Sequence, residues 1–339
     1  MQSPATTIIR APNHLGDLIM ALPALEAAGD ADVMLPRGLA PLLALSATRG
    51  NVLLFDRGLG GYARAVRALR RGRYARGVLL PPSLSSALLF ALGGVRERRG
   101  TPTHHRRPLL TDVVTREHLG GLHRSAQYHA LVIGGPPPRA LVPRLAVPEA
   151  LRARFRALVP GSEGLPLVGV FPGGNAPSRR WAADRFRELV TRFALGGSRV
   201  VVFGGPAERV LSAEAAAGGG IDLGGRTDLP LLAAGLAACE LVVSNDTGPL
   251  HLAAAVGTRT VSLWGAGDST ITGPPAAAHR VLRHPELYCV PCVKNVCPRQ
   301  GRGEFLADAH NECMQLIGVD EVEAAAWAQR REPLITSPA

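Results

Sequence analysis

The sequence predicts an α/β protein made of two domains, each a doubly wound parallel sheet. Short apolar runs rich in β-branched residues alternate with stretches of helical character, which is the pattern of parallel strands joined by helices. The alternation occurs twice, on either side of a proline-punctuated segment at residues 136–166. The 339 residues, 46% of them apolar, are enough for two cores of ordinary size.

These observations define the expected domains. We predict an N-terminal domain at residues 1–150 and a C-terminal domain at residues 151–318, with the carboxyl edges of the two sheets facing a cleft. The last segment, residues 319–339, contains an amphipathic pattern at 319–331. We expect this helix to pack back on the N-terminal domain.

In the first domain, strands are expected at residues 6–11, 33–35, 52–55 and 77–80, and helices at 18–28, 40–45, 61–71 and 83–92. The loop 12–17 follows the first strand and places Asp17 at the carboxyl edge of the sheet, where ligands of such sheets bind. Asp17 is therefore a candidate for chemistry. The plainer alternative is an acid that stabilises a helix N-terminus by ~0.3–1 kcal/mol.

Positive charge is concentrated in the same domain. The chain has 38 basic and 27 acidic residues, and Lys294 is its single lysine. Arginines lie on one side of the helix at 61–71 (Arg64, Arg67, Arg70, Arg71), and a loop region gathers Arg96, Arg98, Arg99, His104, His105, Arg106 and Arg107. This predicts a surface for a phosphorylated acceptor or anionic lipid heads, or else a solvated face in an arginine-rich composition. Nucleic acid is disfavoured, because aromatics are 4% and no groove-reading motif is present.

In the second domain, strands are expected at residues 167–171, 199–203, 241–244 and 259–265, and helices at 149–158 and 181–194. The stretch 241–257 combines an apolar strand, an Asn-Asp-Thr-Gly turn and Pro249 at a first helical position. A helix that begins at this edge directs N–H groups and its positive dipole end at the crevice, which suits a phosphate. We expect Asp246 or Thr247 to cap the helix and His251 to lie within reach of an anion. The alternative is a capped helix with a buried histidine.

The spacing of the cysteines allows two interpretations. Cys289, Cys292, Cys297 and Cys313 have spacings that allow a four-ligand structural zinc or iron site, or a loop of reduced thiols. Cys239 is expected in the core.

The longest apolar run, 83–95, is too short to span a bilayer and is predicted to be a buried helix. Without a signal-like N-terminus, we expect a cytoplasmic protein, with peripheral membrane contact left open.

Four motifs occur in order: residues 12–17 with 21–25, 172–174 with 179–181, 203–208, and 244–251. Together they resemble glycosyltransferase family 9, the ADP-heptose:lipopolysaccharide heptosyltransferases, and are most similar to the heptosyltransferase II branch. The resemblance implies a GT-B fold of two Rossmann-like domains. It also implies inverting transfer of heptose from ADP-heptose to a lipid-linked core oligosaccharide at the inner face of the inner membrane.

The same resemblance implies roles for individual residues. Asp17 matches the general base, and Arg179 stands where relatives usually carry a phosphate-contacting lysine, a change that keeps the charge but alters its geometry. The implied donor-binding residues are Arg179, Arg180, Glu208, Asp246, Thr247, Gly248 and His251. The expected acceptor contacts are Asn13, His14, Arg106 and Arg107. No metal is expected to be required for catalysis, because cationic side chains and helix N–H groups can stabilise the leaving diphosphate.

Three other functions were weighed against this one. A transferase or epimerase for another nucleotide sugar shares the fold class, and a non-catalytic nucleotide-sugar-binding protein would be indifferent to loss of Asp17. A nicotinamide oxidoreductase is disfavoured, because the first turn has Gly16 alone where the dinucleotide fingerprint needs three glycines.

Overall fold

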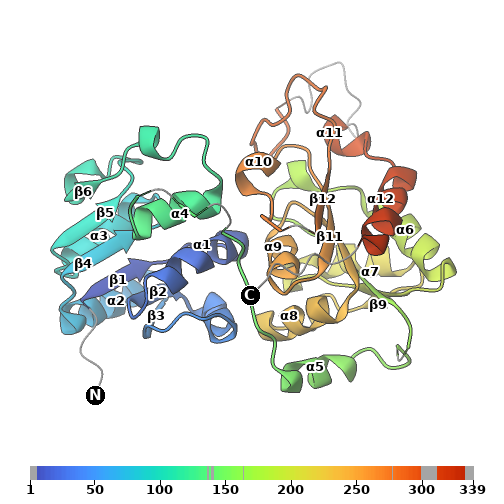
Figure 1. The fold of residues 1–339 in the computed structure, drawn as a ribbon, viewed down its shortest axis with the longest axis horizontal. Helices are drawn as coiled ribbons and strands as arrows, with labels where there is room; N and C mark the ends of the chain where they lie inside the picture. Colours follow the sequence, from blue (N-terminus) through green and yellow to red (C-terminus); the bar gives the residue numbers. More distant parts are fainter. Residues whose placement is uncertain are drawn as a thin grey trace. The chain divides into compact units, whose positions relative to one another are not determined.

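The computed structural model describes residues 6–135, 137–138, 141–162, 164–276, 278–298 and 311–332. The chain forms two compact units, Met1–Leu145 and Ala146–Ala339. Each unit contains a six-stranded, fully parallel sheet with helices on its faces (Figure 1). The α/β fold with two doubly wound sheets is thereby confirmed.

The N-terminal sheet has the strand order β3-β2-β1-β4-β5-β6. Its strands are β1 (Thr7–Arg10), β2 (Asp32–Pro36), β3 (Val52–Phe55), β4 (Arg76–Leu79), β5 (Glu97–Gly100) and β6 (Asp112–Val113). The four strands predicted for this domain are present. Strand β5 was assigned to a basic loop instead, because its sequence Glu-Arg-Arg-Gly carries no apolar alternation. The order reverses between β1 and β4, which makes the carboxyl ends of these strands the switch point of the sheet.

The N-terminal helices are α1 (Leu15–Ala27), α2 (Leu59–Gly72), α3 (Leu84–Leu92) and α4 (Arg124–Val132), with 3₁₀ helices η1 (Arg37–Leu45), η2 (Arg107–Leu109) and η3 (Arg116–His118). The predicted α-helix at 40–45 is part of the 3₁₀ helix η1, in which Pro41 cannot donate a backbone hydrogen bond. Helix α1 packs beside α4, and α2 packs beside α3 (Figure 1).

Helix α3 corrects the expectation of a buried helix. Ala87, Leu89 and Phe90 are fully buried in the core of the N-terminal unit. Leu84, Leu88 and Leu92, however, are 45%, 42% and 48% exposed. Hydrophobicity of the whole segment cannot distinguish a helix covered on all sides from one covered on a single side. In the part of the chain that the structure describes, no helix is long and apolar enough to cross a membrane.

The C-terminal sheet has the order β12-β11-β10-β7-β8-β9, with its switch point between β10 and β7. Its strands are β7 (Leu167–Phe171), β8 (Arg199–Val202), β9 (Ile221–Asp222), β10 (Leu241–Asn245), β11 (Arg259–Leu263) and β12 (His279–Leu282). The helices are α5 (Glu149–Arg156), α6 (Ala183–Leu195), α7 (Arg209–Ala216), α8 (Leu229–Ala238), α9 (Gly248–Ala255), α10 (Ser269–Thr272), α11 (Glu312–Gln315) and α12 (Val319–Arg331), with 3₁₀ helices η4 (Pro177–Arg179) and η5 (Pro206–Glu208).

Helix α12 has the predicted bounds and packs in the core of the C-terminal unit. Val322, Ala325 and Ala326 are buried in the core of the C-terminal unit, together with residues of β11 and α6. Trp327 packs edge-on against Phe193, with 5.5 Å between the ring centroids. The apolar side of this helix is therefore covered by the sheet of its own unit, and its packing on the N-terminal domain stays a prediction.

Candidate active site

The switch point of the C-terminal sheet is held together by Asn245, the last residue of β10. Its side chain is fully buried and donates from Nδ2 to the backbone oxygens of Pro172 and Gly173, at 2.9 and 3.1 Å. Its Oδ1 accepts from the backbone N–H of Trp181 at 3.1 Å. Three buried hydrogen bonds thus fix the loop after β7 against the end of β10. The sequence identified Asn245 only as a turn residue, because all three partners lie more than 60 positions away.

The turn after β10 leads directly into α9, with Pro249 in the first turn as predicted. Thr247 is the N-cap residue, but its side chain makes no capping hydrogen bond and instead lies 3.2 Å from the hydroxyl of Ser244. The prediction of a side-chain cap from Thr247 is therefore wrong. Thr247 therefore leaves the N-terminal amides of α9 uncapped by its own side chain, and a helix N-terminus at the carboxyl edge of the sheet is the geometry of an anion site.

An ion pair lies beside this helix terminus. Arg179 Nη1, at the end of η4, is 2.9 Å from Asp246 Oδ2, and the Asp246 side chain is only 5% exposed. The Nε of Arg179 is buried and has no hydrogen-bond partner among the described residues. Close packing fixes the carboxylate, since a Cβ at Gly267 would lie 2.2 Å from Asp246 Oδ2. Arg179 is therefore held in place, and its side chain is 29% exposed, so that part of the guanidinium stays accessible.

Glu208 joins the ends of β7 and β8. Its Oε2 accepts from the backbone N–H of Gly205 at 2.8 Å. A Cβ at Gly173 would lie 2.0 Å from the other carboxylate oxygen, so only glycine lets Glu208 lie against the loop after β7. Arg180 is oriented by a 2.6 Å hydrogen bond from its Nε to the oxygen of Gly174. The donor residues implied by the sequence thus gather around the loops at one edge of the sheet.

His251 lies one turn inside α9 and is 5% exposed. This burial fits the alternative of a core histidine as well as a ligand contact. Gly248 is the first residue of the same helix and keeps the approach to its N-terminus free of a side chain.

In the N-terminal unit, Asp17 lies in the first turn of α1. The hydroxyl of Tyr128, from α4, donates to Asp17 Oδ1 at 2.9 Å. Tyr128 is buried, and burial, followed by the negative charge of Asp17, raises its pKa well above the ordinary value. The phenol therefore stays protonated and remains a donor. No sequence pattern indicates Tyr128, because α4 is not among the predicted helices and the two partners are 111 residues apart.

We expect Tyr128→Phe to lower kcat by about tenfold, since a hydrogen bond to a charged group contributes roughly 1.5–3 kcal/mol and here fixes one carboxylate oxygen of Asp17. Steady-state kinetics with saturating substrates measures this. Tyr74→Phe is the matched control, because Tyr74 is a buried tyrosine that donates to another carboxylate, Asp32, at 2.5 Å. Both variants lose stability, but only Tyr128→Phe should lose rate. Equal kcat values for the two would contradict a positioning role.

The loop before Asp17 is anchored by Arg10, which is 2% exposed. Arg10 Nη2 donates to Asn13 Oδ1 at 2.5 Å, and its guanidinium lies 4.5 Å from the ring centroid of Phe55. Burial lowers the pKa of Arg10 to about 10, so it is charged at neutral pH. Asn13, predicted to contact an acceptor, thus has an internal partner, whereas His14 is exposed at the start of α1.

Arg106 requires a correction. It was predicted to contact an acceptor, but it is fully buried and donates to the backbone oxygens of Thr101 and Pro81 and to the hydroxyl of Ser86. Burial lowers its pKa to about 10. Arg106 therefore supports the loop between β5 and β6 rather than binding a ligand. Its neighbour Arg107 is exposed.

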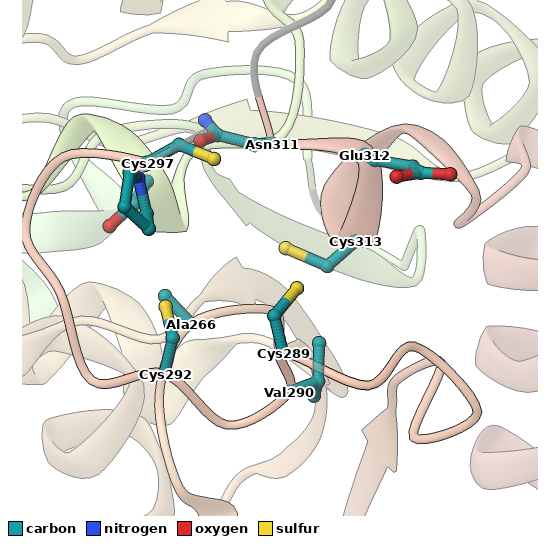
Figure 2. Close-up of a pocket in the computed structure, with 10 residues that line it drawn as sticks. Ala266, Cys289, Val290, Cys292, Cys297, Asn311, Glu312 and Cys313 are labelled. Atoms are coloured by element: carbon teal, nitrogen blue, oxygen red, sulfur yellow. The ribbon is translucent and has the colours of Figure 1, made fainter. Parts of the chain in front are cut away.

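The four clustered cysteines line one cavity of about 30 Å³ in the C-terminal unit. Figure 2 shows the sulfurs of Cys289, Cys292 and Cys297, on the loop at 289–297, and of Cys313, at the start of α11, around this space. Burial, and then the charge of the other three thiols, raises the pKa of Cys313 to about 11. Four thiols suit zinc or iron, and the cavity has room for one ion.

The present spacing of the sulfurs is wider than a coordination shell. Over the described ranges 6–298 and 311–332, gaps excepted, no three Cys, His, Asp or Glu side chains are close enough to hold a metal ion. The donor set therefore fits a metal in type and number, and binding would draw the loops together. The cluster also touches the site above, because Ser178, next to Arg179, donates from its Oγ to the oxygen of Lys294 at 2.5 Å.

Comparison with known proteins gives a consistent result. The family model described as glycosyltransferase family 9 (heptosyltransferase) matches residues 62–302. The lipopolysaccharide heptosyltransferase 2 of Escherichia coli K12 is 28% identical over 303 residues, which cover 81% of this chain and 87% of the relative.

Two solved structures share the fold. The E. coli ADP-heptose LPS heptosyltransferase II superposes with a TM-score of 0.80 at 24% identity, covering 96% of this chain and 98% of that one. The E. coli heptosyltransferase WaaC, solved with ADP-2-deoxy-2-fluoro heptose, gives a TM-score of 0.66 at 18% identity, with 95% and 99% covered.

Proposed function

Since the chain belongs to glycosyltransferase family 9, the heptosyltransferases, we propose that it transfers a heptose from ADP-heptose to a hydroxyl group of a lipopolysaccharide inner-core acceptor. One observation carries this proposal most directly. Arg179, Asp246, Glu208 and the start of α9 lie around the loops at the switch point of the C-terminal sheet. The lipid-linked acceptor would be met at the cytoplasmic face of the inner membrane.

The donor is held by complementary charge. The diphosphate lies at the N-terminus of α9, where backbone amides and the helix dipole favour negative charge. Arg179 adds a fixed, partly exposed guanidinium, and an arginine fork can donate to two phosphate oxygens. In this proposal Glu208 accepts hydrogen bonds from ribose hydroxyls, and Asp246 orients Arg179.

The reaction is a direct displacement at the anomeric carbon. Asp17 takes the proton of the acceptor hydroxyl as its oxygen forms a bond to that carbon. The bond from the carbon to the diphosphate oxygen breaks, and ADP leaves with that electron pair, so the configuration is inverted. Arg179 and the amides of α9 stabilise the charge that develops on the diphosphate, and this chemistry requires no divalent cation.

Calorimetric titration with ADP, UDP, GDP and ADP-heptose, with and without a chelator, tests the donor. The proposal expects selective binding of ADP and ADP-heptose that the chelator does not weaken, followed by formation of a heptosylated acceptor. Preference for UDP or GDP would show that the donor is a UDP-sugar or a GDP-sugar instead of ADP-heptose. ADP-heptose turnover that needs no acceptor would indicate an epimerase, and folded protein that binds none of them would overturn the transferase.

We propose in addition that Cys289, Cys292, Cys297 and Cys313 hold a structural zinc or iron ion, which ties the loop at 289–297 to α11. Because this loop anchors Ser178 beside Arg179, loss of the ion should weaken donor binding.

Cys292→Ser is expected to remove about one equivalent of zinc or iron per chain, to lower Tm and to weaken ADP binding. Elemental analysis and calorimetry measure these effects on the purified protein. Cys239→Ala is the control, because Cys239 is buried outside the cluster. This variant should keep the metal bound to the other four cysteines. If wild-type protein expressed with zinc and iron held no metal, the proposed metal site would be wrong, and the cluster would consist of reduced thiols.

A further inference from the structure

The excess positive charge of the protein comes from one segment. Between Asp56 and Asp112 the sequence has twelve arginines and one acidic residue, Glu97. The rest of the chain has 26 basic and 26 acidic residues, so the whole net charge of +11 arises in residues 57–111. Glu97 is itself paired with Arg76 at 2.9 Å. An arginine-rich genome would raise arginine content everywhere and does not explain this localisation.

The same segment contains the exposed leucines of α3. Leu84, Leu88 and Leu92 are four residues apart, so they form one row along the helix. All three are more than 40% exposed, whereas the opposite side of α3 is fully buried. Ser83 caps the helix by accepting from the N–H of Ser86 at 3.3 Å, and the row is therefore held on a rigid element.

Basic groups lie on both flanks of this row. On one flank, α2 packs beside α3 and presents Arg67, Arg70 and Arg71 to solvent. Arg70 reaches the row itself, since its Nε donates to the oxygen of Leu92 at 3.0 Å.

On the other flank, the loop between β5 and β6 is tied to the start of α3. Thr103 donates to the oxygen of Pro82 at 3.0 Å, and Arg106 donates to the hydroxyl of Ser86 at 3.3 Å. These bonds place the exposed His104, His105 and Arg107 of that loop near the same helix.

We propose that this leucine–arginine face, comprising Leu84, Leu88, Leu92, Arg67, Arg70 and Arg71, binds the surface of a bilayer that contains anionic lipids. The leucines enter the boundary between headgroups and acyl chains, and the guanidinium groups bind lipid phosphates. Each arginine near such a surface strengthens binding about fivefold. A helix with a narrow apolar row between positive flanks is the pattern of an interfacial helix.

The charge pattern also favours a bilayer over a second copy of the chain. A two-fold interface through this face would set arginines against arginines, because the same patch is used on both subunits. A phosphate-rich surface instead complements both flanks. The proposal does not depend on the transfer reaction, although such contact would hold a transferase beside a lipid-linked acceptor.

Cosedimentation of the full chain with vesicles tests whether the leucine–arginine face binds a bilayer. Phosphatidylcholine vesicles with about a quarter phosphatidylglycerol should bind the wild type far better than pure phosphatidylcholine, and salt should weaken the binding. Arg67→Gln with Arg71→Gln should lower the partition constant about 25-fold. Replacing Leu84, Leu88 and Leu92 by asparagine should lower it by on the order of tenfold or more. Leu195→Asn with Val210→Asn is the control, because these side chains are 84% and 80% exposed on the other unit.

Thermal unfolding and ADP titration verify that each variant is folded and keep this test separate from the donor proposal. Equal partitioning of wild type and both face variants, or equal binding to neutral and anionic vesicles, would overturn the proposal. So would sedimentation velocity showing that the leucine variant dissociates an oligomer while its vesicle binding is unchanged, since the face would then contact protein.

Discussion

Asp17→Asn is expected to lower kcat by about 10²–10⁴-fold, because the variant cannot accept the proton of the attacking hydroxyl. ADP affinity should change little, since Asp17 lies in the first turn of α1 and the proposed donor site lies at the ends of β7, β8 and β10 in the other unit. The amide has nearly the shape of the carboxylate and can still contact Tyr128. The loss should therefore appear in kcat rather than in folding.

Single-turnover kinetics with ADP-heptose and a purified acceptor, together with ADP titration, measures both quantities. Asp30→Asn is the matched control, because Asp30 is an exposed carboxylate just after the same helix and should leave the rate unchanged. If Asp17→Asn kept more than about a tenth of the wild-type rate, a general base elsewhere would be required.

Arg179→Ala should weaken ADP binding by about 10–100-fold, as expected for loss of a charge-assisted hydrogen bond of roughly 1.5–3 kcal/mol. It also leaves the Asp246 carboxylate, 5% exposed, without its cation. We therefore expect the free energy of unfolding to fall by about 1–3 kcal/mol. Arg179→Lys restores the charge and should recover much of both losses, though not the two-oxygen geometry.

The double variant Arg179→Ala/Asp246→Asn separates the two effects. It should regain stability relative to Arg179→Ala, since the buried side chain at position 246 is then a neutral amide, but it should still bind ADP weakly. Arg187→Ala removes an exposed arginine of α6 and should change neither the stability nor the ADP affinity. ADP affinity unchanged in Arg179→Ala would exclude Arg179 from the donor site.

Local pattern was sufficient for much of the fold. Strands such as β3 and β7 appear at the predicted residues, because each is an apolar run bounded by turn residues. The start of α9 was also predictable, since a strand, a polar turn and Pro249 are adjacent in the chain. Strand β5 was missed because its exposed and half-buried positions carry charges, and the sheet rather than the side chains determines its conformation.

Side-chain environment was the part that sequence could not supply. Arg106 and Arg107 are adjacent and chemically identical, yet one is fully buried and the other is exposed. Tyr128 and Asn245 act through partners far away in the chain, which neither motif spacing nor periodicity reveals. The expected row of arginines was visible, but the exposed leucines beside it were not, since exposure depends on what packs against α3.

The ion pair between Arg179 and Asp246 has a consequence for turnover. A donor that draws on the Arg179 guanidinium competes with a carboxylate 2.9 Å away that is present whether or not ligand is bound. If ADP binds as proposed, the gain on binding is the difference between two interactions of Arg179 rather than the whole of one, and we expect a moderate affinity for ADP. After the proposed transfer, Asp246 would compete for the same guanidinium and favour departure of the product. The pair would then assist product release as well as recognition.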